Sequence, residues 1–116
     1  MNREIKFRTW DIVPYHDEED KKHEMIYFNL EETRIIENLS MESVVMQYTG
    51  LKDKNGVEIY EGDIIKYQRK GIEELLVVEW CKDYASFMFG HIKVEFALRY
   101  GEVIGNIYEN PELLEG

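Results

Sequence analysis

A run of carboxylates between two histidines is the first feature of this sequence that could bind a metal ion. Residues 17–20 read Asp-Glu-Glu-Asp, with His16 before them and His23 after them. Calcium loops space their carboxylates in a D-x-D-x-D-G pattern, and zinc sites place histidine and cysteine ligands at short fixed spacings; neither pattern occurs here. We therefore expect a solvated acidic loop and no metal site. A zinc site built from His16, His23 and a carboxylate is the alternative.

Cys81 is the sole cysteine, and with His91 it forms the one pair of a nucleophile and a base that the sequence offers. Catalytic thiols need an electropositive and partly exposed setting. Cys81 instead follows the run Leu-Leu-Val-Val-Glu-Trp, which favours a small buried or edge residue of a strand. Phosphate-binding loops, dinucleotide fingerprints and nucleophile elbows are also absent from the sequence. We expect no catalytic residue, no cofactor and no enzyme activity.

Glu61 and Asp63 flank Gly62 and could act as a general acid and base. A carboxylate pair does that work only where its surroundings separate the two pKa values, which spacing alone does not show. Turn chemistry explains the same residues, because Gly62 allows a sharp turn and Asp63 accepts a backbone N–H there. The nearby Asn55-Gly56 pair predicts a tight hairpin turn with positive φ values. We interpret four residues as structural turn residues: Asn55, Gly56, Gly62 and Asp63.

The elements that position these residues are predicted to be β-strands, because apolar and polar residues alternate along most of the chain. Residues 3–10 and 25–30 predict a hairpin whose loop holds the acidic run, and residues 31–43 fit either a short helical face or a connector. Later strands follow at the close spacing of a small antiparallel barrel or sandwich. Asn110 before Pro111 predicts an N-cap and a single closing helical turn. The later strands are expected at residues 44–51, 57–60, 64–69, 74–81, 85–90, 91–96 and 103–108.

The chain is acidic, with 24 acidic side chains against 14 basic ones and a net charge of −10. A field of that sign repels phosphate backbones, so nucleic-acid binding is disfavoured, and its local support is the basic cluster of Lys66, Arg69 and Lys70. The single cysteine indicates a reducing compartment. The N-terminus has no apolar signal sequence, and no segment approaches the ~20 apolar residues of a membrane span. We expect a cytoplasmic protein of one domain without membrane contact.

Three blocks stand out along the chain: REIKFRTWD (3–11), MQYTGLKDKNGVEIYEGDIIKY (46–67) and VIGNIYENPELL (103–114). They resemble the YopX family of phage and prophage proteins, and the resemblance spans the chain from end to end. It implies a single, mainly β domain over residues 1–116, with an N-terminal β-hairpin and connector (an α+β extension, 1–43), a small antiparallel SH3-like barrel (44–116) and a short C-terminal helical turn. It also implies a bacterial host cytoplasm and no established enzyme activity, so no catalytic residue is carried over.

Aromatic residues in an acidic chain indicate contact with other proteins, because tyrosine and tryptophan are enriched at interface hot spots. Tyr48, Tyr60, Tyr67 and Trp80 are the residues expected to form such a surface. Packing of the rings between the barrel and the N-terminal strands is the competing interpretation, and it is favoured for most of the aromatic residues. We therefore expect a non-catalytic phage accessory protein that binds a protein partner or its own copies as a homo-oligomer. A nucleic-acid-associated phage regulator is the second hypothesis.

Overall fold

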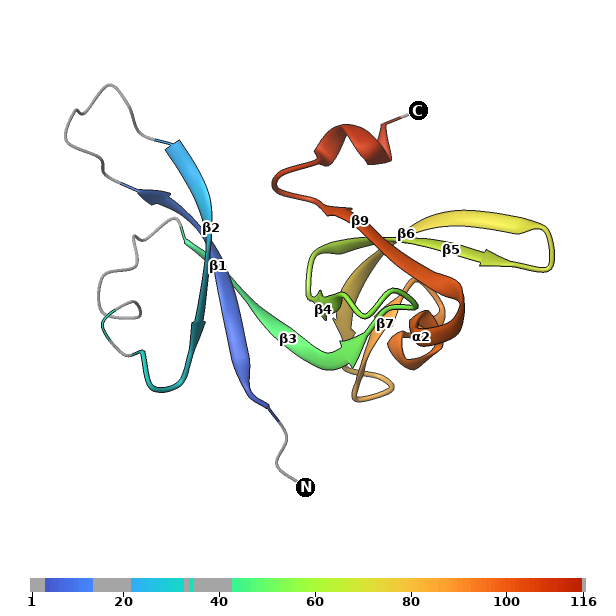
Figure 1. Ribbon diagram of the computed structural model, residues 1–116, viewed down its shortest axis with the longest axis horizontal. Helices are drawn as coiled ribbons and strands as arrows, with labels where there is room; N and C mark the ends of the chain where they lie inside the picture. The colour runs from blue at the N-terminus through green and yellow to red at the C-terminus, as the bar shows by residue number, and fades with distance from the viewer. Residues whose placement is uncertain (1–3, 14–21, 33, 35–42, 116) are drawn as a thin grey trace. The chain divides into compact units, whose positions relative to one another are not determined.

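The computed structural model describes residues 4–13, 22–32, 34 and 43–115 (Figure 1). The described residues form two antiparallel sheets, one of them a curled half-barrel, with a single short α-helix near the C-terminus. The chain divides into two compact units, Met1–Gln47 and Tyr48–Gly116. The acidic run and residues 35–42 of the predicted connector lie outside the described residues.

The first unit is built on the hairpin of β1 (Lys6–Val13) and β2 (Lys22–Asn29), which confirms the predicted pairing. The register places Phe7 opposite Phe28, and their rings stack with centroids 5.7 Å apart. The first residues of β3 (Val44–Lys52) pair with the other edge of β1. Cross-strand aromatic and branched pairs of this kind stabilise antiparallel ladders.

The second unit contains a five-stranded antiparallel sheet in the order β8-β7-β6-β5-β9. The later half of β3 pairs with the short strand β4, with Tyr48 opposite Tyr60. Apart from β8, the strands match the predicted ranges, with ends that differ by one or two residues. Their bounds are β4 (Glu58–Tyr60), β5 (Asp63–Arg69), β6 (Ile72–Cys81), β7 (Ser86–Phe89), β8 (Ile92–Lys93) and β9 (Gly101–Asn106).

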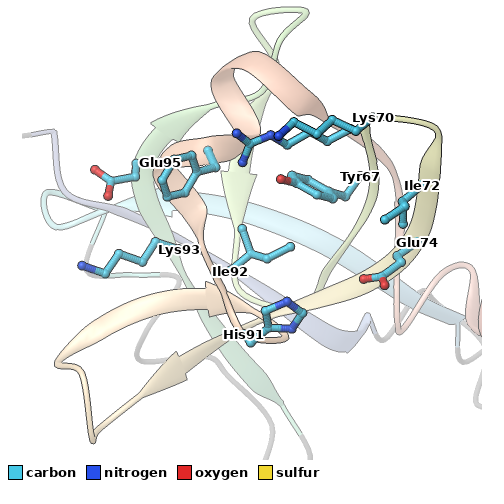
Figure 2. Close-up of a pocket in the computed structure, with 10 residues that line it drawn as sticks. Tyr67, Lys70, Ile72, Glu74, His91, Ile92, Lys93 and Glu95 are labelled. Carbon is cyan, nitrogen blue, oxygen red and sulfur yellow. The ribbon is translucent and has the colours of Figure 1, made fainter.

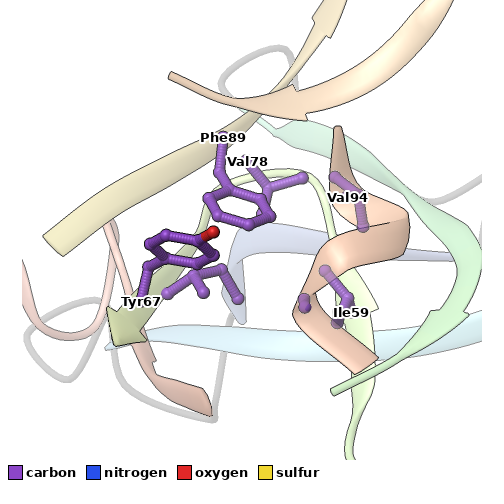
Figure 3. Close-up of a cluster of buried hydrophobic side chains, with 7 residues drawn as sticks. Ile59, Tyr67, Val78, Phe89 and Val94 are labelled. Atoms are coloured by element: carbon purple, nitrogen blue, oxygen red, sulfur yellow. The ribbon is translucent and has the colours of Figure 1, made fainter. Parts of the chain in front are cut away.

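The core of this unit lies against the inner face of the curled sheet (Figure 3). Tyr67 and Phe89 pack their rings together with centroids 5.6 Å apart. Ile65 and Tyr67 alternate along β5, so both side chains point to the face that carries the core cluster. The buried cluster consists of Ile59, Ile65, Tyr67, Val78, Phe89, Val94 and Ala97.

The prediction of a strand over residues 91–96 is wrong beyond Lys93. β8 contains Ile92 and Lys93 alone, and the chain then enters a 3₁₀ turn, η1 (Val94–Phe96), and a short helix, α2 (Ala97–Tyr100). Val94 and Ala97 are both buried, and a spacing of three places side chains on one face of a helix rather than of a strand. Residues 91–96 alternate between apolar and polar types, but the chain turns after Lys93 because Val94 and Ala97 cover the open side of the core.

The closing helical turn is present as η2 (Pro111–Leu114) with proline in its first positions. Asn110 occupies the predicted N-cap position ahead of Pro111, but its side chain makes no capping hydrogen bond to this turn. Its Oδ1 instead accepts the backbone N–H of Asn106 at 3.2 Å. The amide therefore holds the loop that follows β9.

The corner at Glu61-Gly62-Asp63 confirms the predicted turn chemistry. Gly62 has a φ of +85°, a left-handed conformation that favours glycine. Asp63 is 2% exposed, and its Oδ2 accepts the Tyr60 N–H at 2.7 Å. Gly62 also donates its N–H to the carbonyl of Val78 and accepts the N–H of Ile107. The corner thus links β4 to β5 and ties both to β6 and to the residue after β9.

The corner around Asn55-Gly56 is a turn, but the predicted pair of positive φ values is wrong for Asn55. Gly56 alone has a positive φ, +81°. The carbonyl of Asp53 accepts the Gly56 N–H, and the Asp53 carboxylate accepts the N–H groups of Asn55 and Val57 at 2.8 and 2.9 Å. An aspartate that binds the backbone two residues ahead builds its own turn, so the left-handed Asn-Gly geometry is not needed.

Candidate binding groove

Three of the four aromatic residues predicted to form an interaction surface are buried. Tyr48 and Tyr60 are about 5% and 4% exposed and face each other across β3 and β4, with ring centroids 5.4 Å apart. Tyr67 belongs to the core cluster. The surface prediction is therefore wrong for these three residues, because rings that pack across a strand pair gain more by leaving water.

Trp80 is exposed by 52% and remains available as a surface residue. It lies at the end of β6, two residues beyond the buried Val78 on the same strand face, and it meets the edge of Phe87 with ring centroids 5.1 Å apart. The nearby Tyr84 is also exposed. Phe87 packs against the core cluster, so the Trp80 ring continues that cluster toward the end of the β6–β7 hairpin.

The catalytic pairings considered from the sequence are not assembled in the described residues. Cys81 pairs with Ser86, whereas Phe89 pairs with Val78, so His91 lies beyond the opposite end of that ladder. Asp63 uses its carboxylate in the corner described above. No group of three or more histidine, cysteine, aspartate or glutamate side chains placed to hold a metal ion occurs in the part of the chain that the structure describes.

Of the two histidines of the considered zinc site, His23 alone is among the described residues. His23 lies on β2 and stacks on Trp10 with ring centroids 5.5 Å apart. His16 and the acidic run lie outside the described residues. The structure thus gives His23 an aromatic neighbour on the adjacent strand.

A hollow of about 670 Å³ opens beside the β5–β6 turn (Figure 2). The end of β5 and the start of β6 form one wall, and β8 with η1 forms the other. Tyr67 directs its hydroxyl into this hollow, and Ile92 lies across from it. We call it the groove, and its lining consists of Tyr67, Arg69, Lys70, Ile72, Glu74, His91, Ile92, Lys93, Glu95 and Phe96.

The turn between β5 and β6 determines how far one wall extends. Arg69 pairs with Ile72, so Lys70 and Gly71 alone form the turn. Their φ values are +52° and +80°, the two positive values characteristic of a type I′ hairpin turn. Such a turn keeps both strands paired to their ends, so the hairpin projects far enough to place Arg69, Lys70 and Ile72 along the groove.

The lining of the groove contains exposed apolar side chains together with lysine and arginine side chains. Ile72 is 59% exposed and Phe96 is 43% exposed, which is unusual for large apolar side chains gathered at one place. The Arg69 guanidinium lies 4.9 Å from the centre of the Tyr100 ring, a cation–π contact that orders this long side chain. Lys70 and Lys93 supply the other two lysine and arginine charges of the lining.

A second hollow, of about 330 Å³, lies on the same turn and shares Arg69, Lys70 and Ile72 with the groove. Its acidic residue, Glu73, forms an ion pair with Lys66 at 3.4 Å and accepts the amide of Gln68 at 3.2 Å. A hollow therefore lies on each side of the turn, and Arg69 and Lys70 line both hollows.

Sequence reasoning did not identify the groove as a site. Its one signal was the basic cluster of Lys66, Arg69 and Lys70, and the structure divides that cluster. Lys66 pairs with Glu73, while Arg69 and Lys70 line the groove. The contributions of Lys93 and Phe96 come from a segment predicted to be a strand, so their position beside the turn could not follow from that prediction.

Comparison with known proteins identifies relatives of the whole chain. The family model described as YopX protein matches residues 2–115. The crystal structure of protein EF1440 from Enterococcus faecalis is similar, with 29% sequence identity, a TM-score of 0.58, and coverage of 96% of this chain and 98% of that one. No curated protein matches. Among the described residues, no helix is both long enough and apolar enough to cross a membrane. The match over nearly the whole length shows that this chain belongs to the YopX family.

Proposed function

We propose that this chain is a non-catalytic accessory protein of a phage or prophage that binds a protein partner in the bacterial cytoplasm through the groove. The phage setting rests on the kind of family to which the chain belongs. In this proposal the curled half-barrel is an SH3-like barrel that serves as a binding module. The observation that carries the proposal is the groove itself, in which exposed apolar side chains lie beside lysine and arginine side chains.

The size and lining of the groove suit anchor residues of a partner. Its volume of about 670 Å³ lies within the range of ligand pockets, about 300–1,000 Å³. Interface energy is concentrated in a few large side chains seated in such pockets and surrounded by polar contacts. Ile72, Ile92 and Phe96 provide the apolar contact area, and the lysine and arginine side chains of the lining provide orientation.

A matched pair of variants tests whether the groove binds the partner. Ile72 and Leu98 are exposed by 59% and 61%, but Ile72 lines the groove and Leu98 lies outside it. We expect tagged wild-type protein and Leu98→Glu to capture the same partner from lysate of phage-infected or lysogenic bacteria, and Ile72→Glu to lose it. Equal capture by Ile72→Glu would overturn the proposal.

Self-association is measured with the same variants. Light scattering reports the molar mass of the wild-type protein, and an oligomer that dissociates in Ile72→Glu but not in Leu98→Glu would identify a second copy as the partner. A monomeric protein that captures no partner from the lysate would contradict the proposed function.

Single-stranded nucleic acid is the second candidate for the groove, because cations and aromatic rings occur together there. Arg69 and Lys93 lie near Tyr67 and Phe96, the combination that single-strand channels use. The net charge of −10 opposes this candidate. Binding of a labelled thymidine oligomer at low salt, lost on raising the salt, would favour it over a protein partner.

A further inference from the structure

We propose that the groove recognises an acidic peptide segment in which a large apolar side chain lies between carboxylates. This inference rests on the proposed function and specifies the class of partner.

The lysine, arginine and glutamate side chains that line the groove have a positive net charge, whereas the whole chain has a negative one. The groove is lined by three lysine and arginine side chains and two carboxylates, those of Glu74 and Glu95, whereas the chain as a whole has a net charge of −10. In the second hollow the one carboxylate, that of Glu73, is paired with Lys66. An anionic group at the turn therefore meets an excess of positive charge.

The acidic remainder of the chain does not cancel this attraction at contact distance. Charges farther apart than about 8 Å are largely screened at physiological ionic strength. A bound carboxylate would lie within that range of Arg69 and Lys70, which are adjacent in sequence and line both hollows. Distributed surface carboxylates slow the approach of an acidic partner more than they weaken its bound state.

Arg69 is held in a way that suits a carboxylate ligand. Its guanidinium contacts the ring of Tyr100, and this contact uses none of its N–H donors. An arginine ordered by an aromatic ring loses less side-chain entropy on binding and can donate two parallel hydrogen bonds to one carboxylate. Lys70 and Lys93 also line the groove, and each carries an ammonium group.

The shape of the groove requires an apolar residue between the acidic ones. Ile72, Ile92 and Phe96 would remain in contact with water if the ligand were carboxylate alone. Burying apolar surface contributes about 25 cal/mol per Å², so a large side chain seated against them supplies affinity that surface ion pairs alone do not. The recognised segment is therefore acidic residues around one apolar anchor.

Fluorescence anisotropy with labelled pentapeptides tests this inference on the full chain. The probe is Glu-Glu-Phe-Glu-Glu, and its controls are Lys-Lys-Phe-Lys-Lys and Glu-Glu-Ser-Glu-Glu. We expect the probe to bind at least tenfold more tightly than either control. Weaker or equal binding of the probe would overturn the proposal, as would the absence of binding by any of the three peptides.

Two double variants of equal charge test whether the groove cations are responsible. Lys70→Glu with Lys93→Glu should weaken binding of the probe at least tenfold, because it reverses two charges of the lining. Lys54→Glu with Lys82→Glu changes the net charge equally at exposed positions outside the groove and should leave binding within twofold. Equal effects of the two double variants would refute a local role of the groove charges.

The same variants separate this inference from the proposed function. If Ile72→Glu abolishes partner capture from lysate while Lys70→Glu with Lys93→Glu does not affect it, the groove binds a protein but the partner is not acidic. If neither variant affects capture, the proposed function fails as well.

Discussion

Replacing Asp53 with asparagine should destabilise the half-barrel, although the two side chains have nearly the same shape. Asp53 is 1% exposed. Its Oδ1 accepts the N–H groups of Asn55 and Val57 at 2.8 and 2.9 Å, and its Oδ2 accepts the N–H of Val103 on β9 at 2.8 Å. The neighbouring Lys54 donates its N–H to the carbonyl of Gly101. One carboxylate therefore builds a corner and joins it to the edge strand of the sheet.

The magnitude follows from the number of acceptors. Hydrogen bonds to a charged group contribute about 1.5–3 kcal/mol and neutral ones about 0.5–1.5 kcal/mol. Asparagine has one acceptor oxygen, so it keeps the two bonds within the corner as neutral bonds and turns an NH₂ group toward the N–H of Val103. We expect Asp53→Asn to lower the free energy of unfolding by about 2–4 kcal/mol and Asp53→Ala by about 4 kcal/mol or more. A whole domain has about 5–15 kcal/mol of stability, so the alanine variant should lose a large share of it.

Urea unfolding followed by tryptophan fluorescence measures both variants. Trp80 lies in the same unit as Asp53, so its emission reports on the sheet that the carboxylate joins. Asp83→Asn is the control, because Asp83 is exposed in the β6–β7 turn, and it should stay within about 0.5 kcal/mol of wild type. An Asp53→Asn protein that is as stable as wild type would refute the claim that this carboxylate fastens the corner to β9.

Three further substitutions should reduce the free energy of unfolding in the same assay. Gly62→Ala should cost about 1–2 kcal/mol because φ is +85° there, and unchanged stability would refute our reading of that corner. Gly101→Ala should cost about 1–3 kcal/mol although its φ is ordinary, because the added Cβ would lie 2.8 Å from the Cβ of Ala97; a neutral effect would mean that α2 moves freely. Phe89→Ala should cost about 3–5 kcal/mol, whereas Phe96→Ala should cost far less, and equal losses would contradict the assigned core.

Local chemistry predicted most of the strands and the Gly62 corner. Alternating side chains identify strands without knowledge of their partners, and a glycine next to an aspartate specifies a turn within a few residues. The role of Asp53 could not be predicted in this way, because its bond to Val103 joins residues 50 positions apart. The helical turn at Val94 was missed for the same reason, since the need to cover the core arises only in the folded unit.

The groove was harder to predict than the fold. Residue types indicated an aromatic surface, but they do not show which strand face a residue occupies. The alternation along β5 does indicate that Tyr67 is buried, because Tyr67 lies on the same strand face as the apolar Ile65 and both belong to the core. Nothing in the sequence placed Phe96 beside Arg69, because that proximity depends on where β8 ends.

The turn between β5 and β6 connects the fold with the proposed function. Asn55-Gly56 is the favoured sequence for a type I′ turn, yet Lys70-Gly71 is the pair that has two positive φ values. A left-handed conformation costs a residue such as lysine about 1–2 kcal/mol, and strain of this kind is commonly found at binding sites. Lys70 makes the turn less stable than an asparagine would, but it places a positive charge in the lining of the groove. Local stability lost in this way is expected at a residue that binds a partner.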